Sequence, residues 1–163
     1  RRAAAVELVA DAVSARGMVG GQMEDLQATG QVVGVDGPQE ERLERIHRAK
    51  TGRLLTASVE LGAVLAGAGD RLAAFSEFGA ALGLAFQIAD DILDATASAD
   101  DLGKSPGKDA EAGKLTYVTL YGLDAARARL AEIEAELVEC AAGLEGPGGE
   151  LAALSRFVAE RSY

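Results

Sequence analysis

Apolar positions recur with a helical period along most of the chain. Residues 3–15 have this period with no capping residue before them, so the chain looks as if it begins inside a helix of a longer protein. The next segment, GMVGGQMEDLQATG, is also helical in pattern but carries glycines at 17, 20 and 21. Glycines spaced three and four residues apart leave a flat stripe, so we expect another helix to lie close against this one.

Helix start and stop signals divide the rest of the chain. Pro38 suits the first position of a helix that we expect to run to about Leu65 and to stop at the glycines of residues 67–69. Further helices are predicted for residues 71–94, 115–121, 124–142 (with Asp124 as its cap) and 151–161. Residues 30–37 and 97–113 have the composition of polar loops. No strand alternation competes with these helices, so the predicted fold class is all-α.

Composition and charge narrow the class of protein. The 163 residues are 48% hydrophobic and 26% charged, which is typical of a single globular domain spanning residues 1–163. The net charge of −10 would repel a nucleic-acid backbone, and no basic stripe appears, so we expect no nucleic-acid partner. A bound metal ion or a cationic partner fits the sign of the charge better.

Apolar runs and cysteine usage indicate the compartment. The most apolar stretch, Phe78–Ala89, is too short to span a bilayer and contains Gln87, so no membrane span is expected. No signal-peptide pattern is present. The single Cys140 excludes a disulfide framework and favours a reducing environment. The predicted localisation is cytoplasmic.

The stretch FQIADDILD, residues 86–94, carries three aspartates in an otherwise mostly apolar helix. At roughly 100° per residue, Asp94, Gln87 and Asp91 fall within about 100° of Asp90, opposite a stripe of apolar side chains. Such a face is often simply solvated. Ordinary solvated faces mix signs and use Glu and Lys, however, whereas this one has short acids and no base. Hard divalent cations such as Mg²⁺ take carboxylate oxygens, so the face is a candidate metal site.

The lysines are confined in a way that supports this interpretation. The chain has only four lysines, at positions 50, 104, 108 and 114, against twelve arginines. Three of the four follow a glycine in the segments GKSPGKD and GKLTY, just after the aspartate helix. A compact ammonium group on a loop is a good partner for phosphate oxygens, although loops also carry lysines merely because they are wet. Together the acids and lysines predict a site for Mg²⁺ and a diphosphate.

These motifs resemble those of the trans-isoprenyl diphosphate synthases, also called the polyprenyl synthetase family. FQIADDILD, LGKSPGKD and GKLTY are similar to the family's second aspartate-rich region, and GMVGGQMEDL and IHRAKTG resemble its upstream G-Q-x-x-D and K-T motifs. The five motifs occur in the family's order, and the ending LAALSRFVAERSY is also similar. The resemblance is closest to the bacterial short-chain enzymes that make farnesyl or geranylgeranyl diphosphate.

The resemblance implies a fold and an activity. The fold would be the C-terminal part of the all-α isoprenoid-synthase bundle, usually a homodimer. The activity would be Mg²⁺-dependent head-to-tail transfer of a prenyl group from an allylic diphosphate to isopentenyl diphosphate, with release of diphosphate. The family implies up to three Mg²⁺ ions in each site, shared with a first aspartate-rich motif on a facing helix.

The resemblance also implies roles for individual residues. Asp90 would be a direct Mg²⁺ ligand, whereas Asp91 and Asp94 would hold the metal's waters or the neighbouring lysine. The allylic diphosphate would be bound by Lys50 and Lys104, with Lys114 as a weaker candidate.

Four polar residues would line the reaction cavity. Thr51 and Gln87 would face the carbon that carries positive charge, and Gln22 and Asp25 would line the same cavity, with Asp25 orienting Lys50. Simpler interpretations of these four residues remain open. Thr51 could bond only its own helix backbone, and Gln22 and Asp25 could face solvent.

Three further residues have simpler expectations. His47, Cys140 and Lys108 are expected to be a packed or surface histidine, a small core residue and a solvated loop lysine, respectively.

One departure from the family pattern is large. The first aspartate-rich motif is absent, as are the upstream basic residues that hold isopentenyl diphosphate. We therefore expect this chain to be the C-terminal half of such an enzyme, missing its N-terminal half and inactive alone.

Two alternatives stay open. A terpenoid cyclase is disfavoured because Ala95 and Ala99 stand where its metal motif needs a hydroxyl and an acid. A non-catalytic helical subunit that pairs with an active prenyl synthase is the second alternative.

Overall fold

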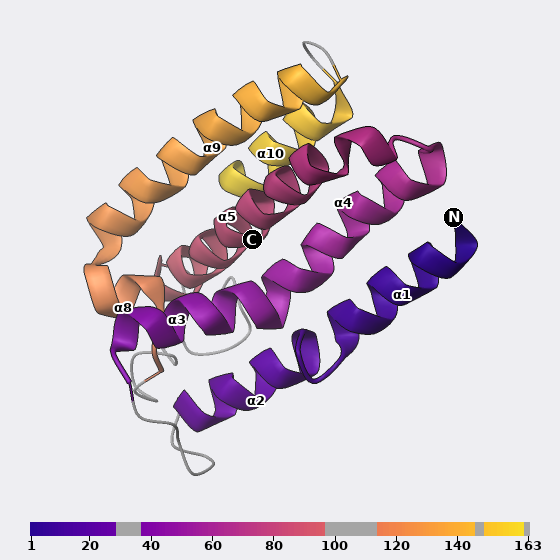
Figure 1. Ribbon diagram of the computed structural model, residues 1–163. Helices are drawn as coiled ribbons and strands as arrows, with labels where there is room; N and C mark the ends of the chain where they lie inside the picture. The colour runs from indigo at the N-terminus through magenta and orange to yellow at the C-terminus, as the bar shows by residue number, and fades with distance from the viewer. Residues whose placement is uncertain (29–36, 97–113, 146–148, 162–163) are drawn as a thin grey trace.

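The computed structural model describes residues 1–28, 37–96, 114–145 and 149–161, and these residues form helices and turns without a strand among them. The first part of the chain forms α1 (Arg2–Val13), α2 (Met18–Ala28), α3 (Gln39–His47), the π-helical turn η1 (Arg48–Gly52) and α4 (Arg53–Ala66). The second part forms the short 3₁₀ turn η2 (Gly69–Arg71), α5 (Leu72–Thr96), α8 (Tyr117–Tyr121), α9 (Leu123–Glu145) and α10 (Glu150–Glu160). The predicted all-α class is confirmed (Figure 1).

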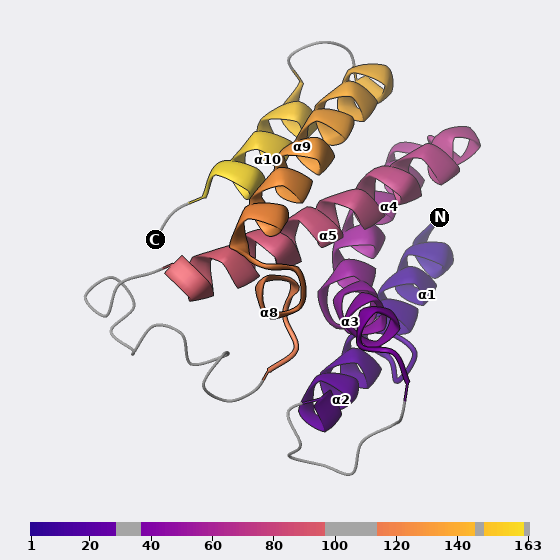
Figure 2. The ribbon, with the colours of Figure 1, turned by 90° about the vertical axis from the view of Figure 1, so that its left-hand side faces the viewer.

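Helix α5 lies at the centre of the bundle. It packs against α4 and η1 on one side and against α9 and α10 on the other, and α1 packs on the far side of α4 (Figures 1 and 2). Its apolar face supplies much of the main core, which is completed by α9 and α10. The buried members of this core on α5 and α9 include Phe78, Leu82, Ile88, Ile133 and Leu137.

The helix predicted from Pro38 to Leu65 exists, but it is not a single α-helix. Gln39 is its first helical residue, Pro38 occupies the capping position before it, and the five residues of η1 interrupt the α-helical pattern. At the far end, Gly67 adopts φ +86°, a left-handed conformation that glycine takes without strain. The predicted stop at Gly67 is therefore confirmed.

The helix ends near α8 differ from the prediction. Asp124 lies inside the first turn of α9, which already begins at Leu123, so it is not the cap that the sequence suggested. Instead, Thr116 caps α8 through a reciprocal pair of bonds with Thr119. Such a capping box satisfies two backbone N–H groups that would otherwise have no helical partner.

The central helix α5 confirms the helix predicted for residues 71–94, and it extends beyond the most apolar stretch, Phe78–Ala89, at both ends. Among the described residues, one helical segment, Gly69–Thr96, is long and apolar enough to cross a membrane by length and composition. It is the core helix of this bundle, and its apolar residues pack against α4, α9 and α10. Of its most apolar window, 44% is buried inside the bundle.

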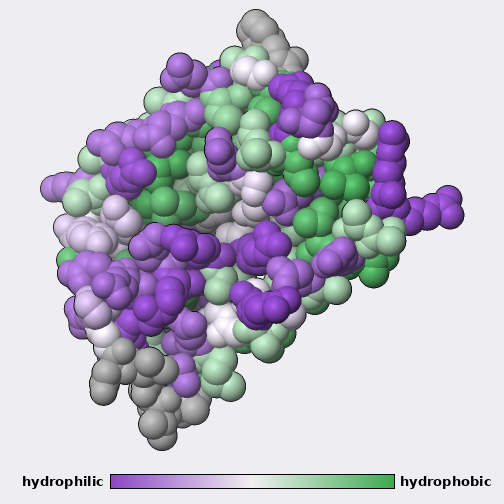
Figure 3. All heavy atoms as spheres, in the orientation of Figure 1, coloured by the Kyte–Doolittle hydropathy of each residue, from purple (hydrophilic) through white to green (hydrophobic). Residues whose placement is uncertain are grey.

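Hydrophilic and apolar side chains occupy different parts of the surface. Figure 3 shows hydrophilic side chains gathered over α3 and along the outer side of α9, with an apolar strip in the hollow between α9 and α4. Large apolar side chains are also exposed on α1 and α2, among them Val6 (69% exposed), Val19 (57%) and Met23 (49%).

Candidate active site

The π-helical turn η1 carries Lys50 and Thr51, and two glycines allow its neighbours to approach it closely. A Cβ atom on Gly21 of α2 would lie 2.2 Å from the backbone nitrogen of Lys50, and one on Gly83 of α5 would lie 2.6 Å from the Cα of Gly52. Real side chains do not tolerate such distances, so both contacts require glycine. A π turn inside an α-helix is frequent at functional sites. Here it is packed between α2 and α5.

Lys50 and Asp25 form an ion pair across this contact. The Nζ of Lys50 lies 2.5 Å from Oδ2 of Asp25, and their side chains are 28% and 11% exposed. A charge-assisted hydrogen bond of this kind fixes the direction of a long, flexible side chain. An ammonium group has three N–H donors, so two remain for other oxygens in the pocket. The contact expected between Asp25 and Lys50 is present.

Thr51 and Gln87 form a second polar pair. The Thr51 hydroxyl donates to Oε1 of Gln87 at 3.1 Å, which joins η1 to α5. Both side chains are uncharged and neither is a strong nucleophile. The pair lines the same pocket as Lys50.

Asp90 and Asp91, which are neighbours on α5, do not share one environment. Asp90 has a half-exposed side chain, whereas the side chain of Asp91 is only 8% exposed. Oδ2 of Asp91 accepts a hydrogen bond from the backbone N–H of Tyr117 at 2.7 Å and lies 3.5 Å from Nε2 of His47. Successive residues of a helix point about 100° apart, so Asp91 faces α8 and α3 whereas Asp90 does not.

A pocket of about 130 Å³ lies where these elements meet. Of the residues predicted for the site, the pocket is lined by Asp25, Lys50, Thr51, Gln87, Asp90, Asp91 and Lys114. Gln22, in contrast, is exposed on α2 and is not among the lining residues, and neither is Asp94. Lys104 and Lys108 lie outside the described residues.

Several residues to which the sequence assigned no site role also have defined surroundings. His47, expected as a packed or surface histidine, is 6% exposed and lines the pocket, as does Phe86. Arg161 lies in the C-terminal segment LAALSRFVAERSY, for which the sequence predicted no site residue, and it contacts Phe86 and Asp90 from the end of α10. Desolvation raises the pKa of the Tyr117 hydroxyl above its ordinary value, so this group stays protonated at neutral pH.

Cys140 packs against the core as expected, and burial raises the pKa of its thiol.

The donor atoms of the pocket suit a hard cation such as Mg²⁺. Among the described residues, no three His, Cys, Asp or Glu side chains gather closely enough to hold a metal by themselves. Mg²⁺ does not require such a cage, because it keeps several waters and is usually bound by one or two carboxylates plus substrate phosphates. The half-exposed carboxylate of Asp90 meets that requirement, and Asp94 lies one turn further along α5.

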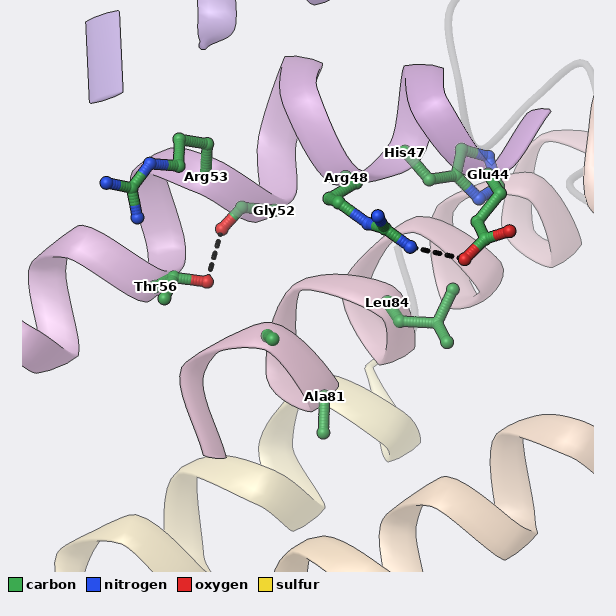
Figure 4. Close-up of a pocket in the computed structure, with 9 residues that line it drawn as sticks. Glu44, His47, Arg48, Gly52, Arg53, Thr56, Ala81 and Leu84 are labelled. Carbon is green, nitrogen blue, oxygen red and sulfur yellow. Dashed lines mark hydrogen bonds and ion pairs between the residues drawn. The ribbon is translucent and has the colours of Figure 1, made fainter. Parts of the chain in front are cut away.

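A second, larger pocket of about 420 Å³ lies between α5 and the α3–α4 helix (Figure 4). Its floor is apolar, with Ala81 and Leu84 among the lining residues, and His47 lines both pockets. The polar groups at its rim have partners within the protein. Arg48 is paired with Glu44, and the Thr56 hydroxyl donates to the Gly52 carbonyl at 2.8 Å.

The fold and the smaller pocket together indicate the class of protein. It is an all-α bundle in which aspartates of the central helix line a pocket with lysines from neighbouring segments. The family model described as "Polyprenyl synthetase" matches residues 1–142. The chain belongs to the polyprenyl synthetase family.

Individual relatives support the same assignment. The chain is 44% identical over 154 residues to a "Probable farnesyl diphosphate synthase" of Sinorhizobium fredii, covering 91% of this chain and 45% of that protein. It is 39% identical over 159 residues to geranylgeranyl pyrophosphate synthase 11 of Arabidopsis thaliana, covering 96% of this chain and 44% of that protein.

A solved structure has the same fold. The geranyltransferase of Helicobacter pylori, complexed with magnesium and isoprenyl diphosphate, superposes with a TM-score of 0.75 at 25% identity. The match covers 97% of this chain and 50% of that one. The chain thus spans about half the length of the relatives it matches.

Proposed function

We propose that this chain contributes one wall of the active site of a Mg²⁺-dependent prenyltransferase. The enzyme would join an allylic diphosphate to isopentenyl diphosphate, forming farnesyl or geranylgeranyl diphosphate and releasing diphosphate. The observation that carries the proposal is the pocket that gathers the Lys50 ammonium, the Thr51–Gln87 pair and the Asp90 carboxylate. Membership of the family and the names of the relatives support it.

Lys50 would bind the diphosphate of the allylic substrate. In the reaction the allylic carbon–oxygen bond breaks, and both bonding electrons leave with the diphosphate. Fixed cations stabilise that developing negative charge most effectively when they are already oriented. Asp25 holds the Lys50 ammonium at 2.5 Å, so the cation does not have to be ordered during the reaction.

Thr51 and Gln87 would face the allylic carbon as it becomes positive. Their oxygens are polar enough to stabilise a cation but form no covalent bond with it. The hydrogen bond between them, at 3.1 Å, keeps both oxygens in place across the interface of η1 and α5. The double bond of isopentenyl diphosphate would then attack this cation and form a carbon–carbon bond. The resulting cation would lose a proton to the released diphosphate, and this loss would re-form a double bond.

Asp90 would be the protein ligand of Mg²⁺. A bound Mg²⁺ neutralises charge on the diphosphate and so makes it a better leaving group. Asp90 suits this role because its carboxylate lines the pocket and is half exposed, whereas Asp91 is engaged by Tyr117. Lys114 also lines the pocket and would add a second cation.

Turnover would need more than these 163 residues. Since the chain spans about half the length of its relatives, we propose that a second part of the protein supplies the first aspartate-rich motif and the isopentenyl diphosphate site. The chain alone would then bind diphosphate without turning over. We further propose that the complete protein is a cytoplasmic homodimer.

The test combines a binding and an activity measurement. Calorimetry with inorganic pyrophosphate should show binding to the chain that depends on Mg²⁺. Lys50→Gln should weaken this binding about tenfold or more, equivalent to about 1.4 kcal/mol, because a charge-assisted contact is lost. The matched control Arg127→Gln removes one positive charge from an exposed site on α9 and should leave the affinity unchanged. Binding that is absent or independent of Mg²⁺ would contradict the proposal.

The activity measurement uses isopentenyl diphosphate, Mg²⁺ and allylic primers of increasing length. The chain alone should give no product, and the complete protein should give farnesyl or geranylgeranyl diphosphate. Asp90→Ala should abolish this activity in the complete protein. Full activity in that variant would exclude Asp90 as a metal ligand.

One observation favours a second candidate, a non-catalytic subunit that pairs with an active prenyl synthase. Asp91, one of the acids expected at the metal, takes part in packing because its carboxylate accepts the N–H of Tyr117. A subunit of this kind should not bind pyrophosphate in a Mg²⁺-dependent way, so the calorimetry above discriminates between the two functions.

A further inference from the structure

Arg161, at the end of α10, contacts the pocket wall in three ways. Its NH2 group donates to the backbone carbonyl of Phe86 at 3.0 Å and to Oδ1 of Asp90 at 3.2 Å. Its guanidinium carbon also lies 4.0 Å from the centre of the Phe86 ring. These contacts link residues more than 70 positions apart in the sequence, and they join the end of the last described helix to α5.

The environment of Arg161 differs from that of an ordinary surface arginine. Its side chain is 18% exposed, and its Nε is buried without a hydrogen-bond partner in the described structure. Burying a guanidinium group with an unpaired N–H costs free energy. The salt bridge to Asp90 offsets little of this cost, because the Asp90 side chain is half exposed and exposed salt bridges contribute little. The stacking on Phe86 and the two hydrogen bonds are what hold the group in this position.

Asp90 is the pocket carboxylate that Arg161 contacts. One carboxylate oxygen, Oδ1, is bound to Arg161, and the half-exposed side chain lines the pocket beside Lys50. A carboxylate that is held through one oxygen keeps a defined rotamer and can offer the second oxygen to a cation. Partners of this kind orient metal ligands in many proteins, and their loss typically costs tenfold or more in metal affinity.

We propose that Arg161 is a positioning residue, which holds Asp90 for binding of a divalent cation with diphosphate and couples this binding to the docking of α10. This inference rests on the proposed function, because it concerns the same pocket and the same carboxylate. It adds a residue that lies outside the aspartate and lysine motifs. It also assigns a role to α10, which otherwise contributes only to the core.

The test is a double-mutant cycle on the whole chain, with calorimetry of inorganic pyrophosphate in the presence of Mg²⁺. Arg161→Gln should weaken binding by roughly tenfold. In an Asp90→Asn background, the same change should have no further effect, because Arg161 acts through Asp90. Arg161→Lys should recover part of the affinity, since it keeps the charge but cannot bond both acceptors in the same geometry.

The matched control is Arg156→Gln. Arg156 lies on an exposed face of the same helix, so this variant makes the same change in charge without touching the pocket. An effect of Arg161→Gln no larger than that of the control would overturn the inference, as would an equal effect in the Asp90→Asn background. In both cases a loss of affinity in Asp90→Asn alone would leave the proposed function standing. If Asp90→Asn itself has no effect on binding, the proposed role of Asp90 and the inference both fail.

A second measurement needs no ligand. Hydrogen exchange at the last turn of α10 should become faster in Asp90→Asn, because loss of the carboxylate charge weakens the contact with Arg161. Arg161→Gln should produce a similar increase, and the double variant should exchange no faster than the faster of the two. Unchanged exchange in Asp90→Asn would overturn the proposed coupling between α10 and the pocket.

Discussion

Gly21 of α2 lies directly against the backbone of Lys50, so close that a Cβ atom would fall 2.2 Å from the Lys50 nitrogen. Asp25, one turn further along α2, pairs with the side chain of the same lysine. A single helix therefore sets both the position of the Lys50 backbone and the direction of its ammonium group.

Gly21→Ala should separate α2 from η1. The methyl group meets main-chain atoms, which cannot move aside as a flexible side chain would. We expect the free energy of unfolding to fall by about 1–3 kcal/mol, as is common for overpacking, and pyrophosphate binding to weaken because the Lys50–Asp25 pair is displaced. Chemical denaturation and calorimetry measure the two effects.

The matched control is Gly62→Ala. Gly62 lies on an exposed face of α4, and a Cβ there would meet no atom within 4 Å. Alanine should stabilise the helix by about 0.5–1 kcal/mol relative to glycine. A Gly21→Ala variant that is as stable as the control, with unchanged binding, would contradict the packing role of Gly21.

Asp91→Ala should destabilise the fold because this acid is part of the packing. Its carboxylate accepts the Tyr117 N–H at 2.7 Å and lies beside the buried His47. Removing it leaves a backbone donor at the start of α8 without its partner, which typically costs about 1–3 kcal/mol. Asp91→Asn keeps an oxygen acceptor and should lose less.

Asp70→Ala serves as the control for Asp91, since Asp70 is an exposed aspartate in η2. Chemical denaturation should show at most a few tenths of a kcal/mol for this variant, as is usual at exposed sites. If Asp91→Ala were equally mild, the contact with Tyr117 would not stabilise the fold.

The contrast between Asp90 and Asp91 shows how far the sequence could predict the site. The helices could be located from the sequence by the spacing of apolar residues and by the positions of proline and glycine. These signals are local, because each depends only on residues a few positions apart. The direction of Asp91 depends on the N–H of Tyr117, which the fold brings up from 26 residues away. A helical wheel contains no information about that donor.

Three other features required the fold as well. The π turn at Lys50 has no local sequence signal, and it shifts the register of the residues after it. Gln22 appeared equivalent to Asp25 by spacing, yet only Asp25 lines the pocket. Arg161 reaches Asp90 only because α10 folds back along α5, a relationship that no spacing rule predicts.

Acid should weaken the contact between α1 and α4. Asp11 of α1 accepts hydrogen bonds from Arg53 of α4 at 3.0 Å and from Arg16 at 2.9 Å, and these two arginines hold the pKa of Asp11 below its ordinary value of 3.8. A lowered pKa in the folded state means that the ionised form is the one stabilised. Its contribution is therefore complete above about pH 4 and is lost as the pH falls further.

The free energy of unfolding, measured by urea denaturation across this pH range, should show the effect. Asp11→Asn should be less stable than the wild type at pH 7 and should lose less stability on acidification. Glu7→Gln, at an exposed position of the same helix, is the control and should retain the pH dependence of the wild type. Identical pH profiles for Asp11→Asn and the wild type would contradict a role for this ion pair.

The exposed apolar side chains of α1 and α2 should cause the purified chain to associate. Val6, Val19 and Met23 are each about half exposed or more, and clusters of large apolar side chains on a surface usually mark an interaction site. Light scattering should therefore give a mass above the 16.7 kDa of one chain. The double variant Val19→Gln, Met23→Gln keeps good helix formers and should shift the mass towards that of the monomer. Leu154→Gln, at a 39% exposed site on α10, should not. A monodisperse 16.7 kDa wild-type chain would show that these side chains do not drive association.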